Sequence, residues 1–156
     1  MKLELLMNYH AILTNTHEIG KGPFGNRMIV EVDGGEFDGP KLKGEFLRPS
    51  AADWLTLADD GYGHLDVRIT AKTHDGALIY IEYLGKLELN DAVQKSLAGD
   101  GDGTDYGDQY FNDNVYFVRR GVAHECFMPD FHLACARGDL DAAVMMLESR
   151  RRNYGE

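Results

Sequence analysis

An acidic and a basic side chain, Asp66 and Arg68, stand two positions apart in a run of alternating residues. Side chains at positions i and i+2 of a β-strand leave the same face, so this carboxylate and guanidinium can form a hydrogen-bonded ion pair. A carboxylate held in this way stays ionised and can accept a phenolic or α-proton, while the guanidinium stabilises the resulting anion. The pair therefore indicates acid–base chemistry if its face lines a pocket, and an ordinary surface salt bridge if its face meets solvent.

Further candidates surround the pair in the sequence. Tyr80, on the next expected strand, is placed to donate a proton to the other end of a substrate. Asp53 is either a second base or a residue that orients Arg27. Because Asp53 and Trp54 are neighbours, only one of them can face the interior of a sheet, and Trp54 is then either a stacking surface or part of the core. Arg27, Trp54 and Glu45 form the predicted substrate-binding set.

No metal or cofactor site is predicted. Four residues carry side chains that zinc accepts: His124, Cys126, His132 and Cys135. Their spacing matches no standard zinc motif. The acidic loop at 100–111 has Asp105 where a calcium loop needs glycine and Phe111 where it needs glutamate. No glycine cluster stands between a strand and a helix, as a phosphate site requires.

Strands must position these candidates. Apolar residues recur with a period of two, which is typical of strands, over most of each of five segments: 3–13, 27–32, 41–47, 53–58 and 65–72. Segment 77–84 is almost wholly apolar, as expected of a strand that is buried on both faces. Asp-Gly and Gly-Gly pairs between them favour hairpins. Many short strands with little helix predict a mainly β protein, an antiparallel β-barrel, with one short helix capped by Asn90 or Asp91 and ended by Gly99.

The last part of the chain has a different pattern. Apolar residues from Phe131 to Arg152 follow a helical spacing, interrupted at Gly138 and Asp139, and resemble the helix pair of one ankyrin repeat. This pattern predicts a C-terminal helical hairpin. The predicted domains are therefore a β-barrel at 1–122 and a helical appendage at 123–156.

The composition excludes several classes of protein. The chain has 156 residues, 44% of them hydrophobic, and a formal net charge of −10, so it can build one core and repels nucleic-acid phosphates. No apolar run approaches the roughly 20 residues that span a bilayer, and the N-terminus lacks a signal-peptide core. Two cysteines are too few for a disulfide scaffold. We expect no nucleic-acid partner, no membrane association and a cytoplasmic location.

Several motifs, in order along about the first 111 residues, resemble the family known as domain of unknown function 3237. They are L-E-L-L at 3–6, G-P-F-G at 22–25, D-G-G-E-F-D-G-P-K-L-K-G at 33–44, A-D-W at 52–54, L-D-V-R at 65–68, D-G-A-L-I-Y at 75–80 and Y-F at 110–111. The resemblance implies a small barrel of the allene-oxide-cyclase-like (calycin) type with an internal pocket, assembled as a homo-oligomer. Fungal natural-product members look like cofactor-free enzymes that close oxygen rings on phenolic or terpenoid skeletons.

The chain departs from the family pattern after residue 111. The family continues with an R-T-x-P-x-F-E-T strand and a Y-x-W-L-N segment, which are absent here. Residues 111–118 look like a terminal strand, so we expect about one strand and its turn to be missing. Such a loss would leave the barrel with an open edge.

Together these features predict a cofactor-independent cyclase or isomerase of secondary metabolism that acts on a small hydrophobic or aromatic metabolite. Its predicted catalytic residues are Asp66, Arg68, Asp53 and Tyr80. Two alternatives remain open: a non-catalytic barrel that stores a hydrophobic ligand, and an oligomeric interaction protein whose tail mediates assembly.

Overall fold

The computed structural model describes residues 3–98, 103–105, 108–119, 122–136 and 139–149, and side chains within 5–98, 103–105 and 108–111. Its strands are β1 (Leu3–Gly22), β2 (Gly25–Asp38), β3 (Gly44–Asp53), β4 (Thr56–Leu57), β5 (Tyr62–Thr73), β6 (Leu78–Glu88), β7 (Phe111–Arg119), β8 (Val122–Ala136) and β9 (Asp139–Ser149). The helix α1 spans Asp91–Leu97. The prediction of a mainly antiparallel β protein with one short helix is confirmed within these residues.

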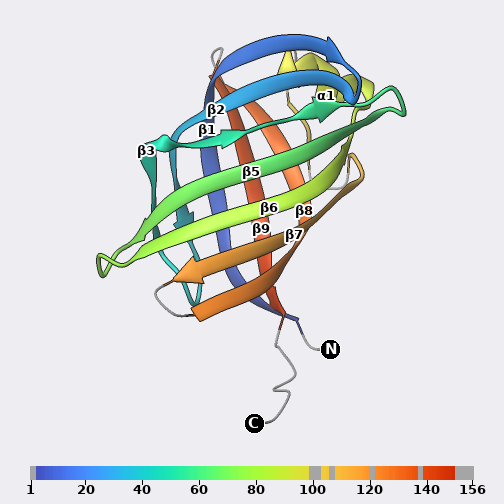
Figure 1. The fold of residues 1–156 in the computed structure, drawn as a ribbon. Coiled ribbons are helices and arrows are strands. Elements are labelled where there is room, and N and C mark those ends of the chain that lie inside the picture. The colour runs from blue at the N-terminus through green and yellow to red at the C-terminus, as the bar shows by residue number, and fades with distance from the viewer. Residues whose placement is uncertain (1–2, 99–102, 106–107, 120–121, 137–138, 150–156) are drawn as a thin grey trace.

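All of these strands belong to one sheet. Its order is β1-β9-β8-β7-β6-β5-β3-β2-β4, and β1 also pairs with β2. The pairings therefore return on themselves and form a closed ring of strands (Figure 1). Within the described residues, no helix is long and apolar enough to cross a membrane.

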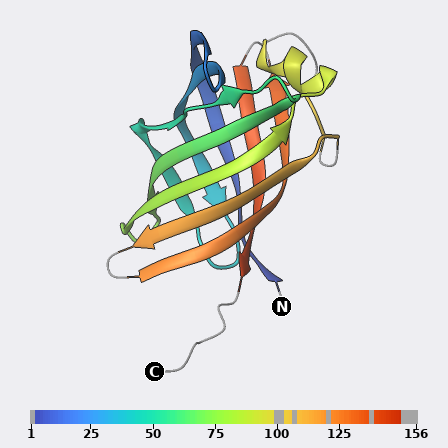
Figure 2. The same cartoon turned by 45° about the vertical axis from the view of Figure 1, so that its right-hand side comes forward.

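The interior of the ring is the hydrophobic core. Along β5 the side chains of Leu65, Val67, Ile69 and Ala71 are buried, and the alternate side chains are partly or fully exposed. This is the period of two expected from the sequence. Helix α1 lies at one end of the ring (Figure 2). Asn90 caps it by accepting a hydrogen bond from the Val93 backbone N–H, which confirms one of the two predicted caps.

The predicted C-terminal helical hairpin is wrong. Residues 122–136 and 139–149 form β8 and β9, which pair with each other, while β8 also pairs with β7 and β9 with β1. The missing strand and the open edge are also wrong, because β9 joins β1. Two helices would have left the hydrogen-bonding edges of β1 and β7 without partners, and pairing those edges outweighs the local helical spacing. The domain division at residue 122 stays a prediction.

Strand β3 carries a bulge that matters for the site. Phe46 pairs with Ala71 and Ala51 with Ile69, so residues 47–50 of β3 lie opposite a single residue of β5. The register with β2 is interrupted over the same residues. Pro49 lies in this stretch and has no N–H to donate to a neighbouring strand. We refer to residues 47–50 as the β3 bulge.

Candidate functional site

The ring encloses an interior cavity of about 50 Å³. Its walls are almost entirely apolar, and Leu97 of α1 reaches it from the end of the ring. The exceptions are Asp53 and two tyrosines, Tyr9 and Tyr83, whose hydroxyl oxygens lie 3.0 Å apart in a buried hydrogen bond. Pockets that hold a metabolite are usually about 300–1,000 Å³. The interior cavity thus has room for a water molecule or for one hydroxyl-sized group of a metabolite, but not for a whole metabolite.

Asp53 is the carboxylic acid among the described residues that line this cavity. Burial raises the pKa of its carboxyl from 3.8 to about 7. The Asp66 backbone N–H, which donates to Asp53 Oδ1 at 3.0 Å, lowers the pKa again, and the Asp66 carboxylate raises it. Arg27 lowers it by a smaller amount. A carboxyl with a pKa near 7 can both accept and release a proton at neutral pH, which is the property of a general acid–base catalyst.

The backbone explains why Asp53 sits there. Trp54 N–H donates to the Asp66 carbonyl oxygen at 3.0 Å, as in an antiparallel pair. The reciprocal donation from Asp66 N–H goes to the Asp53 carboxylate, because the Trp54 carbonyl accepts from Arg27 Nη1 at 2.6 Å instead. Asp53 therefore replaces a backbone oxygen at the end of β3. Arg27, predicted to bind substrate, holds this bend in place.

The Asp66–Arg68 pair forms as predicted but on the outer face of the ring. Its closest nitrogen–oxygen distance is 3.0 Å, and the side chains are 31% and 43% exposed. The expectation that the pair lines an enclosed pocket is wrong, because its alternating partners on β5, among them Val67, fill the interior. On the outer face the Arg68 guanidinium lies 5.1 Å from the centre of the Trp54 ring.

Two other predicted residues also lie outside the cavity. Tyr80 donates its hydroxyl hydrogen bond to Glu82 Oε2 at 2.7 Å. Burial, followed by that hydrogen bond, raises the pKa of Tyr80, while nearby Arg68 lowers it. Glu45 is exposed on β3 between Glu36 and Lys72, its cross-strand partners on β2 and β5, and lines neither the cavity nor the groove described next.

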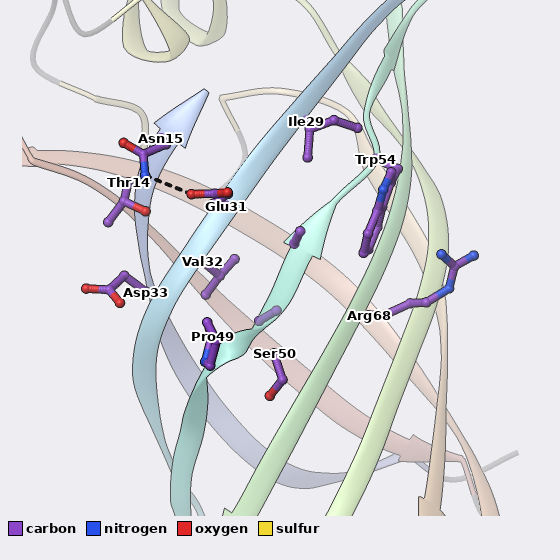
Figure 3. A pocket seen from close by; sticks show the side chains of 12 residues that line it. Thr14, Asn15, Ile29, Glu31, Val32, Asp33, Pro49, Ser50, Trp54 and Arg68 are labelled. Atoms are coloured by element: carbon purple, nitrogen blue, oxygen red, sulfur yellow. Dashed lines mark hydrogen bonds between the residues drawn. The ribbon is translucent and has the colours of Figure 1, made fainter. Parts of the chain in front are cut away.

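An outer groove of about 820 Å³ lies over β2, β3 and β5. Figure 3 shows Trp54 and Arg68 along one side of it and Thr14 and Asn15 along the other, with Val32, Pro49 and Ser50 between them. Of the predicted residues, the structure brings Trp54 and Arg68 together here. It separates them from Asp53, because Asp53 and Trp54 point to opposite faces of β3, as their adjacency in a strand requires.

Charges at the rim of the groove are mostly paired. Glu31 accepts a hydrogen bond from Asn15 at 2.7 Å and lies 3.2 Å from His17. These hydrogen bonds, Asn15 first and His17 second, lower the pKa of Glu31. Asp33 forms a 3.0 Å ion pair with Arg48.

Sequence reasoning missed the groove as a site. Its unpredicted residues include Asn15, Ile29, Glu31, Val32 and Asp33. Their strand periodicity places Ile29, Glu31 and Asp33 on one face, but only the pairing of β2 with β3 shows that this face lies beside Trp54.

No group of three or more described His, Cys, Asp or Glu side chains is arranged to hold a metal ion. The side chains of the four zinc candidates lie outside the described residues: His124, Cys126, His132 and Cys135.

Comparisons with known proteins agree with one another. Over 73 residues, the chain is 33% identical to a UPF0311 protein of Rhodopseudomonas palustris, a match that covers 47% of the chain and 45% of that relative. The chain thus matches less than half the length of this relative. Over 132 residues, it is 24% identical to a UPF0311 protein of Clostridium acetobutylicum, covering 80% of the chain and 78% of the relative.

Solved structures share the fold. A conserved protein of unknown function from R. palustris superposes with a TM-score of 0.77 at 18% identity, covering 95% of the chain and 98% of that structure. A β-barrel-like protein from Acinetobacter baumannii gives a TM-score of 0.68 at 22% identity, covering 94% and 96%. The family model of the protein of unknown function DUF3237 matches residues 1–118. The chain belongs to the DUF3237 family.

Proposed function

We propose that the protein is a cofactor-independent enzyme that moves a proton on a small phenolic or polycyclic metabolite, as a cyclase or isomerase, with Asp53 as its acid–base group. The observation that carries the proposal is the Asp53 carboxyl on the wall of an apolar cavity, with a pKa of about 7. Perturbed carboxyls of this kind are concentrated at catalytic sites. The Tyr9–Tyr83 pair offers hydroxyl groups to a bound oxygen atom across the same cavity.

The proposal assigns different roles to the remaining predicted catalytic residues. Asp66 supplies a backbone N–H that holds the Asp53 carboxylate in position. Arg68 and Tyr80 lie on the outer face and do not reach the cavity. The proposal also includes the finer fold assignment, in which the closed ring is an allene-oxide-cyclase-like barrel. Assembly as a homo-oligomer and a cytoplasmic location stay predictions.

Deuterium exchange tests the proposed chemistry without knowledge of the natural substrate. Cyclohexanone offers an α-proton and resorcinol offers a phenolic ring, and both exchange protons for deuterium when an acid–base group acts on them. We expect the wild-type protein to accelerate exchange of at least one probe in D2O, measured by proton NMR, with a pH midpoint near 7. Asp53→Asn should abolish the acceleration. Asp66→Asn keeps the backbone N–H and removes the carboxylate that raises the pKa of Asp53, so this matched control should retain the acceleration with a lower pH midpoint.

Two results would contradict this assignment. One is a wild-type rate equal to that of buffer for both probes. The other is an equal loss of rate in Asp66→Asn, which would show that the chemistry depends on the outer face.

A non-catalytic binder is the second candidate, and one observation favours it. Asp53 replaces the Trp54 carbonyl in the hydrogen bonding between β3 and β5, which is a structural use that requires no reaction. This reading predicts that Asp53→Asn still binds an aromatic ligand and that no probe is turned over. The third reading, an interaction protein with an open sheet edge, loses its premise because β9 pairs with β1.

A further inference from the structure

The outer groove and the interior cavity share one wall. Val32 lines both, and it is buried, with 6% of its surface exposed. Val30, two residues earlier on the same face of β2, lines the cavity alone. Val32 is therefore the side chain that lies between the two spaces.

We propose that the groove and the cavity are two parts of one binding site for a small, uncharged, planar molecule, connected at the β3 bulge and separated by Val32. The inference rests on the proposed function, because Asp53 stands on the cavity side. It identifies the class of substrate and the path by which that substrate reaches the acid.

The β3 bulge explains why the path lies here. Along most of the ring, neighbouring strands are joined by regular hydrogen bonding, and a molecule could pass between them only by breaking several of those bonds. The registers of β3 with β2 and with β5 both skip residues 47–50. The groove lies over this interruption, with Pro49 and Ser50 in its wall (Figure 3). A molecule in the groove therefore meets the side chain of Val32 where the sheet is interrupted.

The chemistry of the groove selects the class of ligand. Ile29, Pro49, Ala52 and Trp54 give it apolar surface, and the ring of Trp54 suits a flat partner. Glu31, whose pKa is lowered, is ionised at neutral pH.

Charge discriminates against anions. The two carboxylates that line the groove are paired, Glu31 with Asn15 and His17 and Asp33 with Arg48. The guanidinium of the groove, Arg68, is paired with Asp66. A carboxylate ligand would have to displace Asp66 from Arg68, so an uncharged ring is favoured. A hydroxyl on that ring would then meet Asp53 within the cavity.

The single tryptophan gives a direct readout, because Trp54 lines the groove and is the one tryptophan of the chain. Nitroaromatic rings quench tryptophan fluorescence on contact. The probes are 4-nitroanisole, which is uncharged, and 4-nitrobenzoate, a similar ring that carries an anion. We expect saturable quenching by 4-nitroanisole and weaker binding of 4-nitrobenzoate. Absence of saturable quenching by either probe, or tighter binding of 4-nitrobenzoate, would overturn the assignment.

The passage is tested by a matched pair of variants. Val32→Ala opens the shared wall and should tighten 4-nitroanisole binding by about fourfold for each methylene-sized area that becomes buried. Val93→Ala removes the same atoms from a buried position on α1 that lines neither the groove nor the cavity, and it should leave the affinity unchanged. Equal effects in the two variants would refute a passage at Val32. Should Val32→Ala not fold, Val32→Ile narrows the passage and should weaken 4-nitroanisole binding, and unchanged binding in Val32→Ile would refute the passage.

The two proposals fail in different ways. Asp53→Asn should still be quenched by 4-nitroanisole, because binding in the groove needs no proton transfer. A protein that is quenched by 4-nitroanisole but does not accelerate deuterium exchange would contradict the proposed catalysis and leave the binding site intact. A protein that accelerates exchange but is not quenched would refute the groove as the binding site.

Discussion

Replacing Asp53 by asparagine should stabilise the protein at neutral and alkaline pH. Asparagine retains an oxygen that can accept the Asp66 N–H, and it removes the charge that burial disfavours. The pKa of Asp53 is about 7 in the folded protein and starts from 3.8. The folded state thus binds more protons than the unfolded state between those two values, so the wild-type free energy of unfolding falls as pH rises through that window.

The size of the effect follows from the shift. One pKa unit corresponds to about 1.4 kcal/mol, so ionising Asp53 costs the folded state about 4 kcal/mol above pH 7 and nothing below pH 3.8. Between pH 5 and pH 8 the wild type should lose about 2.5 kcal/mol relative to Asp53→Asn. Urea unfolding of both proteins across this range measures the difference, and subtraction cancels the titration of the other groups.

A flat difference between the two proteins would refute the reasoning. It would mean that Asp53 keeps the same charge in the folded and unfolded states across this pH range, and that the cavity wall does not perturb it. If Asp53→Asn is less stable than the wild type at every pH, the hydrogen bond from the Asp66 N–H to the ionised Asp53 carboxylate outweighs the cost of burying that charge.

Four further substitutions test the packing of the ring by thermal or urea unfolding. Gly35→Ala should lower the free energy of unfolding by more than about 2 kcal/mol, because Gly35 has φ +145° and a Cβ there would meet the His10 carbonyl oxygen. Gly76 has φ +86° and open space around it, so Gly76→Ala should lower the free energy of unfolding by about 1 kcal/mol. Equal losses in the two variants would contradict this account. Tyr9→Phe removes the buried hydrogen bond to Tyr83 and should cost about 1 kcal/mol, whereas no change in stability would show that this bond contributes nothing. Asp66→Asn breaks a partly exposed ion pair and should change the free energy of unfolding by less than about 1 kcal/mol. A loss several times larger would show that the pair is buried and does not lie on the solvated outer face.

Local sequence pattern predicted the elements whose burial alternates strictly. The alternation of residues 65–72 identified β5 and placed Asp66 and Arg68 on one face. It could not say which face is outside, because that choice depends on how the sheet curves and closes. The adjacency of Asp53 and Trp54 did predict that they separate, and the structure places them on opposite faces.

The tail shows where local pattern fails. Short apolar runs such as Ala142–Leu147 satisfy helix and strand periodicity about equally well. The deciding factor is the free edge of β1, a strand more than 100 positions earlier in the chain, which pairs with Leu147, Met146 and Met145. Pairing over such a distance is a property of the whole sheet and leaves no local signal in the residues that join it.

Asp53 combines a structural role in the sheet with the proposed chemical role. Residues 47–50 interrupt the register of β3, and at the end of the same strand the Trp54 carbonyl turns to Arg27 while Asp53 takes its place against Asp66. A carboxylate fixed by a backbone N–H keeps its orientation while its other oxygen remains able to exchange a proton. A structural role for Asp53 therefore does not compete with a catalytic role, because the hydrogen bond that completes the sheet also aims the acid. Asp53→Asn tests the structural and the proposed catalytic role together, because it should preserve the fold and remove only the ability of the side chain to exchange a proton.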